Sequence, residues 1–325
     1  MAETANIAKI AEKLSAELFK EFFWSPIGPR NQNWECEEQA RHGTTKHPTD
    51  VVFYFDEPYS KARTYVNCDL KSYAKGTIKS QAIHSAIESL SRAINCAEKS
   101  ESWRKFYIHD HVSPEICGLL FVYNHDGGFD KDFSHYLRTF KSEKLDLPLG
   151  SKIVVLGPGD ILWLDNVRLE ITMLRGKGTL PLAAKCRFFY PHLTRRPNVQ
   201  IKEARAATLE MLTAPWIVLE YEVPDAERKL GYLVFYRRQG EETSEFLYLI
   251  DYLKHYQILR ENVSVTIKTY ETAANAHSSF DKAVQQYVEE CGGPETDLAN
   301  LLKAIRYEKM TQMISTFSDV ELGME

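Results

Sequence analysis

Two neighbouring strand-like runs constrain this chain more than any other feature, because each carries an acidic residue beside apolar neighbours. The first run, Val51 to Phe55, begins directly after Asp50, and the second, Thr64 to Tyr73, contains Asp69 and Lys71. Side chains alternate in direction along a strand, so Asp69 and Lys71 point to the same face. With Asp50 supplied by the neighbouring strand, two carboxylates beside a lysine predict a site for a hard divalent cation.

The order of predicted elements around these residues resembles the core of the PD-(D/E)xK nuclease superfamily, in which a helix with a glutamate precedes three strands and a second helix. The literal proline-aspartate dipeptide is missing, because Thr49 separates Pro48 from Asp50. The resemblance implies an α/β fold, a restriction-endonuclease-like mixed sheet flanked by helices, over residues 1–145. The elements predicted from hydrophobic periodicity are a helix from Thr4 to Trp24, strands from Asn33 to Glu38, Asp50 to Phe55 and Thr64 to Tyr73, a helix from Thr77 to Lys99 capped by Thr77, and a strand from Cys117 to Tyr123.

The resemblance also implies roles for these residues. It implies Mg²⁺, or Mn²⁺ as a substitute, held by Asp50, Asp69 and a glutamate of the first helix, with Lys71 orienting or activating water for phosphodiester hydrolysis. The plainer alternative makes Asp50 a turn residue, and Asp69 and Lys71 a solvated pair on a strand.

The helical glutamate is one of Glu12, Glu17 and Glu21. At about 100° per helical residue, Leu14 and Leu18 lie on an apolar stripe that includes Glu21, while Glu17 lies at its margin and Glu12 projects away. A carboxylate on a buried face is costly unless it is paired or binds a metal, so Glu21 is predicted as the third acid and Glu17 as the second choice. The predicted first strand offers three competitors, Glu35, Glu37 and Glu38.

A glutamine or lysine often lies near the start of the next helix in this superfamily, and Gln81 and Lys79 occupy that position. The resemblance implies that Gln81 helps to position the attacking water or a phosphate. The first turn of a helix also attracts anions through its free backbone N–H groups. The alternative is that Gln81 is an ordinary polar residue of a first turn.

Length and charge limit the class of protein. A chain of 325 residues exceeds what one core usually organises, and a boundary between Phe140 and Lys152 is expected to separate residues 1–145 from an α+β domain over residues 146–325. No apolar stretch approaches the roughly 18 residues that span a bilayer, and the N-terminus lacks a secretory signal, so the expected location is the cytoplasm with no membrane partner. The net charge of −5 argues against a dedicated high-affinity DNA binder but does not exclude a nuclease.

Cysteine and histidine spacing gives no metal motif. The six cysteines, at positions 36, 68, 96, 117, 186 and 291, form no CxxC pair, and the ten histidines show no HxxxH or HExxH spacing. The cysteines are therefore expected to be core or strand residues rather than disulfides or zinc ligands. Neither Gly157-Pro158-Gly159 nor Gly176-Lys177-Gly178-Thr179 matches a nucleotide-binding loop, so any nucleotide hydrolysis would come from another chain.

The second half carries no motif that indicates chemistry. Its predicted strands are 153–156, 161–164, 167–174, 186–190, 216–223, 231–238 and 263–270, and its predicted helices are 201–212, 245–259, 278–291 and 298–315. Cations and aromatic residues cluster only between Lys185 and Arg205, where cations could contact phosphates and rings could stack on bases. The plainer alternative, favoured residue by residue, is a strand of core aromatics followed by a basic loop. The cluster comprises Lys185, Arg187, Phe188, Phe189, Tyr190, His192, Arg195, Arg196, Lys202 and Arg205.

Two classes of function follow. The first is a metal-dependent endodeoxyribonuclease that acts in bacterial defence against phage or foreign DNA, where the second domain would recognise DNA or dock an ATPase or helicase. The second is a catalytically inert, nuclease-like subunit that binds DNA or assembles a complex. The polar set of Asp50, Asp69 and Lys71 favours the nuclease, since a core kept only for packing has no use for it. The preference for DNA over RNA and the formation of a homo-oligomer stay open.

Overall fold

A computed structural model describes residues 2–191, 204–223, 230–311 and 314. The chain divides into two compact units, the first made of residues 1–165, 206–213 and 314–325 and the second of residues 166–205 and 214–313. The first unit therefore continues beyond the boundary that we expected between Phe140 and Lys152. None of the helices in the described ranges is long and apolar enough to cross a membrane.

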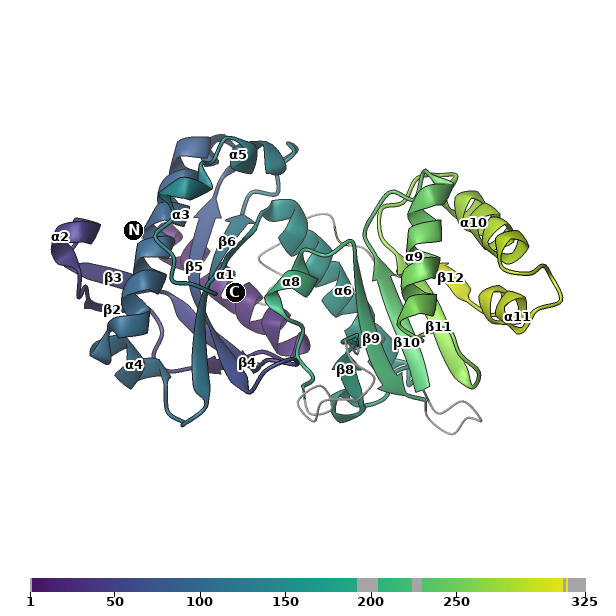
Figure 1. The fold of residues 1–325 in the computed structure, drawn as a ribbon. Helices are drawn as coiled ribbons and strands as arrows, with labels where there is room; N and C mark the ends of the chain where they lie inside the picture. The colour runs from purple at the N-terminus through teal and green to yellow at the C-terminus, as the bar shows by residue number, and fades with distance from the viewer. Residues whose placement is uncertain (1, 192–203, 224–229, 312–313, 315–325) are drawn as a thin grey trace. The chain divides into compact units, whose positions relative to one another are not determined.

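The first unit is built on a five-stranded mixed sheet with the strand order β1-β4-β5-β6-β7. Figure 1 labels the central strands β4, β5 and β6. Its strands are β1 (Ser25–Ile27), β4 (Val51–Asp56), β5 (Ala62–Tyr73), β6 (Ser113–Asn124) and β7 (Ile153–Leu156). β4 runs antiparallel to both of its neighbours, β1 and β5, whereas β5, β6 and β7 are parallel. Parallel strands end on the same side of the sheet, so the carboxyl ends of β5 and β6 lie next to each other.

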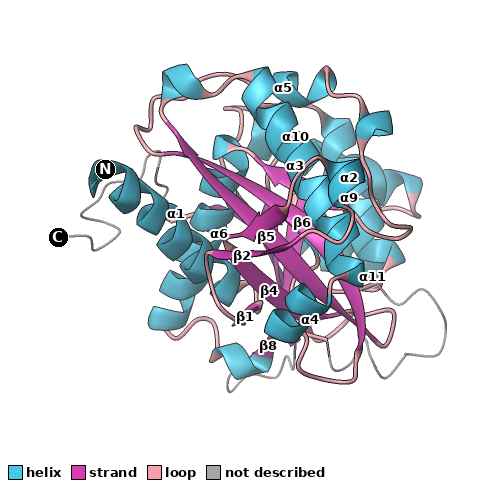
Figure 2. Cartoon of the chain, turned by 90° about the vertical axis from the view of Figure 1, so that its left-hand side faces the viewer, coloured by secondary structure: helices cyan, strands magenta, loops and turns pink. Residues whose placement is uncertain are grey.

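Helices cover both faces of this sheet (Figure 2). On one face lies α1 (Ala2–Glu21), whose Phe19 ring packs edge-on against Phe53 of β4 and Phe121 of β6. On the other face, α3 (Ser80–Lys99) shares a buried cluster with Val52 and Leu120. Shorter helices complete the unit, namely α2 (Gln39–His42), α4 (Glu101–Tyr107), α5 (Ser134–Arg138) and α8 (Leu209–Leu212). The predicted mixed sheet flanked by helices is confirmed.

A separate ribbon of two antiparallel strands, β2 (Gln32–Glu35) and β3 (Lys46–Thr49), precedes β4. The strand predicted at Asn33 to Glu38 is therefore not the first strand of the main sheet, and that prediction is wrong. The edge position belongs to β1, whose three residues include Pro26. So short a strand falls below what hydrophobic alternation can detect.

The start of the second predicted helix also needs correction. Lys75–Thr77 forms a 3₁₀ turn, and α3 begins at Ser80 with Lys79 in the N-cap position. The Thr77 hydroxyl donates to the Ala74 carbonyl at 2.8 Å. Thr77 therefore closes a local turn and does not cap the helix.

The second unit contains another five-stranded sheet, with the order β12-β11-β10-β9-β8. β8 and β9 are antiparallel to their neighbours, while β10, β11 and β12 are parallel. The helices α9, α10 and α11 bury one face of this sheet against residues such as Val234 and Ile267. The bounds are β8 (Cys186–Phe188), β9 (Trp216–Glu222), β10 (Leu230–Tyr236), β11 (Val263–Thr269), β12 (Arg306–Lys309), α9 (Thr243–His255), α10 (Ala276–Glu290) and α11 (Asp297–Lys303).

Three predictions for this half are wrong or incomplete. The two strands predicted at 161–164 and 167–174 form a single helix, α6 (Pro158–Gly176), which begins in the first unit and continues in the second. The predicted closing helix at 298–315 ends at Lys303 and is followed by β12. Of the helix predicted at 201–212, residues 201–203 lie outside the described ranges, and the helical part is only α8.

Candidate active site

Asp50 is held by the backbone between β3 and β4. Its N–H donates to the Cys68 carbonyl at 3.3 Å, and its own carbonyl accepts from the Asn31 N–H at 2.8 Å. One carboxylate oxygen, Oδ2, accepts from the Leu70 N–H at 2.6 Å. The two backbone bonds place Asp50 beside β5, the Leu70 N–H orients its carboxylate, and the Asp69 side chain is a further hydrogen-bonding neighbour.

The strand register brings Asp50 and Asp69 together. Val51 pairs with Cys68 in the antiparallel ladder of β4 and β5, so the preceding residue, Asp50, lies opposite Asp69. Side chains directly opposite each other have Cβ atoms about 4.5–5.5 Å apart. The structure therefore places the two predicted carboxylates on the same side of the sheet.

Lys71 completes this group. Its Nζ lies 2.5 Å from Asp69 Oδ1, with the lysine side chain 36% exposed and that of Asp69 18% exposed. Both residues lie near the carboxyl end of β5, where β5 pairs with the end of β6. The three side chains predicted from the sequence to converge, those of Asp50, Asp69 and Lys71, do so.

The electrostatics of the group reflect two neighbouring acids beside one lysine. Burial raises the pKa of Asp50, and the neighbouring Asp69 carboxylate raises it further, against the opposing effects of the Leu70 N–H and the Lys71 ammonium. Burial lowers the pKa of Lys71, but the Asp69 and Asp50 carboxylates outweigh it and leave that pKa raised. Lys71 therefore stays charged, and Asp50 is a carboxylate that gains from added positive charge.

The glutamates of α1 differ in their surroundings. Glu12 forms an ion pair with Arg30 at 2.6 Å, Glu17 is exposed, and Glu21, the last residue of α1, is half-buried. Among the described residues, a group of Cys and His side chains has its ligand atoms within 4.8 Å of one another, and this group lies elsewhere in the unit. The structure thus brings Asp50 and Asp69 together without showing Glu21 as a third member.

Gln81 lies in the first turn of α3 with its side chain exposed, and Lys79 precedes the helix. Their position after β5 is the one expected from the sequence. No hydrogen bond or ion pair joins either of them to the Asp50 carboxylate within the described part of the chain, so their roles stay predictions.

Two further residues of β5 flank the acids and were missed from the sequence. Asn67 and Tyr73 lie on the same face as Asp69 and Lys71, because they are two positions away along the strand. Asn67 is buried, and neither atom of its side-chain amide has a hydrogen-bonding partner in the described ranges. Burial raises the pKa of Tyr73 against the effect of Lys71. The same alternation that selected Asp69 and Lys71 would have found both.

The donor set fits a hard divalent cation. Mg²⁺ prefers carboxylate oxygens and usually retains several waters, so it needs only one or two protein carboxylates. Asp50 and Asp69 supply these, and Lys71 stands beside them as a non-ligating cation. The arrangement suits metal-assisted hydrolysis of a phosphate ester.

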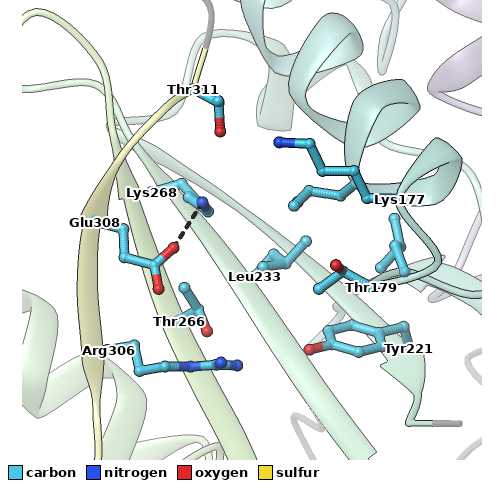
Figure 3. Close-up of a pocket in the computed structure, with 11 residues that line it drawn as sticks. Lys177, Thr179, Tyr221, Leu233, Thr266, Lys268, Arg306, Glu308 and Thr311 are labelled. Carbon is cyan, nitrogen blue, oxygen red and sulfur yellow. Dashed lines mark ion pairs between the residues drawn. The ribbon is translucent and has the colours of Figure 1, made fainter.

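The second unit has a pocket of about 260 Å³ between the end of α6 and the sheet (Figure 3). Lys177, Lys268 and Arg306 are among the residues that line it. The buried Lys268 ammonium forms ion pairs with Glu308 at 2.7 Å and Glu170 at 3.0 Å. Burial lowers the pKa of Lys268, but these two carboxylates outweigh it. Since this charge is already balanced, Lys268 does not make the pocket an anion site.

The predicted basic and aromatic cluster is only partly described. Lys185 pairs with Glu222 at 3.3 Å, and Arg187 pairs with Glu220 at 2.6 Å. The aromatic side chains at 188–190 are buried, which agrees with the alternative of a strand of core aromatics and not with rings that stack on bases. Arg205 is described, and its guanidinium donates to the Cys186 carbonyl. The other members of the cluster lie outside the described residues, namely His192, Arg195, Arg196 and Lys202.

Comparison with known proteins agrees with the geometry of the first unit. Residues 1–160 match the model of the family described as the GAPS4 protein PD-(D/E)XK nuclease domain. No curated protein matches the chain. The matched range includes α1, the whole mixed sheet and the group formed by Asp50, Asp69 and Lys71.

Proposed function

We propose, from the membership of residues 1–160 in the PD-(D/E)xK nuclease superfamily, that the chain is a metal-dependent endonuclease that hydrolyses phosphodiester bonds of DNA. The match of residues 1–160 to the nuclease domain of a GAPS4 protein supports a role in defence. The biological role proposed here is therefore the destruction of phage or other foreign DNA.

The observation that carries the proposal is the convergence of Asp50, Asp69 and Lys71 at one end of the paired strands β4 and β5. Asp50 is fixed by the Leu70 N–H, and Asp69 by contact with Lys71. A structural role alone does not explain this set, because burying a carboxylate beside a second one costs free energy. A divalent cation bound between them would remove that cost.

Each residue has a distinct part in this proposal. Asp50 and Asp69 would hold Mg²⁺, for which Mn²⁺ could substitute, and Glu21 would approach as a further ligand. When bound, the metal supplies a Lewis acid and a water of lowered pKa. Lys71 would orient that water and stabilise the charge that develops on the phosphate. Gln81 would position the water or a substrate phosphate from the first turn of α3.

The test is cleavage of plasmid DNA in Mg²⁺ by the unaltered protein, Asp69→Asn and a control, Asp56→Asn. Asp56 lies at the far end of β4, where its exposed side chain pairs with Arg63. We expect the Asp69 variant to lose cleavage and the Asp56 variant to keep it. Full activity in Asp69→Asn would exclude this group as the active site, even if the protein is a nuclease.

The same assay, extended to RNA and Mn²⁺ and run beside a measurement of DNA binding, decides between the nuclease and the inert subunit. If the unaltered protein binds DNA but cleaves neither DNA nor RNA in Mg²⁺ or Mn²⁺, the nuclease-like unit serves binding or assembly. Cleavage of RNA alone would change the substrate and leave the roles of Asp50, Asp69 and Lys71 in place.

The second unit is proposed to supply phosphate contacts or a docking face for an ATPase or helicase. Arg195 and Arg196 test this, and Arg187, already paired with Glu220, is the matched control. If Arg195→Ala/Arg196→Ala weakens DNA binding and lowers its salt dependence, these residues contact phosphates. If it abolishes only co-purification with a partner, the docking role is supported, and no change in either measurement would exclude both roles.

A further inference from the structure

Four metal-ligating side chains lie together in the first unit, away from the acidic group. Cys36, His42, His47 and Cys96 are all buried, with at most 3% of each residue exposed. Their ligand atoms lie within 4.8 Å of one another. They come from three places: the end of β2 with α2, the strand β3, and the last part of α3.

The sulfur–sulfur separation matches tetrahedral coordination, and the sulfur–nitrogen separation is shorter than the ideal value. Cys36 Sγ lies 3.8 Å from Cys96 Sγ and 3.2 Å from His42 Nδ1. In a tetrahedral zinc site with Zn–S bonds near 2.3 Å, two sulfurs are about 3.8 Å apart, and a sulfur and a nitrogen are about 3.6 Å apart. A disulfide does not account for the pair, because its sulfurs would be about 2.05 Å apart and the two histidines would have no role.

The surroundings resemble those of bound metal ligands. His42 turns Nδ1 towards Cys36, and its Nε2, which makes no hydrogen bond among the described residues, lies 3.4 Å from the Asp146 carboxylate. A carboxylate in this place is a common second partner of a metal-bound histidine. The backbone N–H of Glu37 donates to Cys96 Sγ at 3.0 Å. Buried His47 Nε2 has no hydrogen-bonding partner among the described residues. Burying an unpaired polar atom costs free energy unless another group binds to it.

We infer that Cys36, His42, His47 and Cys96 form a structural Zn²⁺ site. Two thiolates would neutralise the ion, and four protein ligands leave no position for a reacting water, which distinguishes a structural from a catalytic zinc site. The site is separate from the Mg²⁺ chemistry proposed above and does not depend on it.

A zinc ion held by these four ligands would link the β2–β3 ribbon to α3. An isolated two-stranded ribbon is marginally stable at best. β3 ends at Thr49, immediately before Asp50, and the Trp34 indole N–H of β2 donates to the Thr49 hydroxyl at 2.9 Å. The zinc site therefore holds the segment that enters the acidic group, and its ligands act as positioning residues.

The first experiment measures the metal directly in full-length protein purified without a metal-affinity step. In an Asp69→Asn background, which keeps the acidic group out of the measurement, we expect about one zinc per chain by elemental analysis. Replacement of zinc by Co²⁺ should give the visible absorption of a tetrahedral ion and a thiolate charge-transfer band. Protein without stoichiometric zinc, and without this spectrum when titrated with Co²⁺, would overturn the inference.

Variants then identify the ligands. Cys96→Ser should remove the zinc and the cobalt charge-transfer band, whereas Cys117→Ser, an equally buried cysteine of β6, should retain both. If Cys96→Ser does not fold, Asp146→Asn serves instead, because loss of a second partner lowers zinc affinity about 10- to 100-fold without removing a ligand. Full zinc content in folded Cys96→Ser, or unchanged zinc affinity in Asp146→Asn where Cys96→Ser does not fold, would refute the site.

Discussion

Replacing Lys71 by methionine separates its catalytic role from metal binding. Methionine retains an unbranched apolar stem and removes the ammonium. The ammonium contacts Asp69 at 2.5 Å, so it competes with a cation for that carboxylate. We therefore expect Lys71→Met to lower turnover without weakening the affinity for Mg²⁺.

The exposure of the pair sets the magnitude. Lys71 is 36% exposed and Asp69 18%, so solvent screens their attraction, and such a pair contributes at most about 1 kcal/mol. Releasing Asp69 should therefore tighten metal binding by no more than about fivefold. Loss of a charge that stabilises the transition state typically costs about 10²- to 10³-fold in turnover, so the catalytic effect should be much the larger.

Isothermal titration with Mg²⁺ or Mn²⁺ measures the first quantity, and single-turnover cleavage of plasmid DNA at saturating metal measures the second. The matched control is Lys61→Met, since Lys61 is an exposed lysine just before β5. Metal affinity reduced more than about tenfold in Lys71→Met would show that the lysine organises the ligands, contrary to its proposed role. Turnover equal to that of the unaltered protein would remove Lys71 from the mechanism.

Three further expectations concern neighbouring positions. Without metal, Asp50→Asn should raise the midpoint of thermal unfolding at neutral pH. The pKa of Asp50 is raised in the folded protein, so its ionised form costs stability above that pKa, and the gain should vanish below the unfolded pKa of 3.8. A gain that persists below pH 3.8 would contradict this cause. Gly118→Ala should destabilise the first unit by about 1–3 kcal/mol in urea titrations, because the added Cβ would lie 2.4 Å from Ile94 Cδ1, and unchanged stability would mean that α3 shifts freely. Glu21→Gln should reduce metal-dependent cleavage more than Glu17→Gln, and the reverse order would transfer the third-ligand role to Glu17.

The acidic group could be predicted because it depends on local rules. Alternation along β5 puts Asp69 and Lys71 on one face, and a strand that starts directly after Asp50 pairs with β5 in a register that sets Asp50 opposite Asp69. Every step uses residues about 20 positions apart or fewer, and the turn between β4 and β5 is short. The family resemblance added the roles but was not needed for the juxtaposition.

The errors arose where short apolar runs are compatible with either a helix or a strand. Ile161, Leu164, Val167, Ile171 and Leu174 are all buried on α6, and their spacing of three or four residues is the helical pattern. Dividing that stretch into two runs hid the period and favoured strands. β1 and β3 were missed for a different reason, since strands of three or four residues with a proline have too little pattern to detect.

The Cys and His cluster shows a third kind of limit. Cys36 and Cys96 are 60 positions apart, and the intervening residues cross three strands before α3 delivers Cys96. No spacing rule predicts such a meeting, because only the packing of α3 against the sheet sets it. Both proposed metal sites nevertheless share one short stretch of chain, in which His47 and Asp50 are separated by two residues. Loss of zinc should therefore displace Asp50 through β3, whereas removal of the Asp50 carboxylate should leave the zinc site intact.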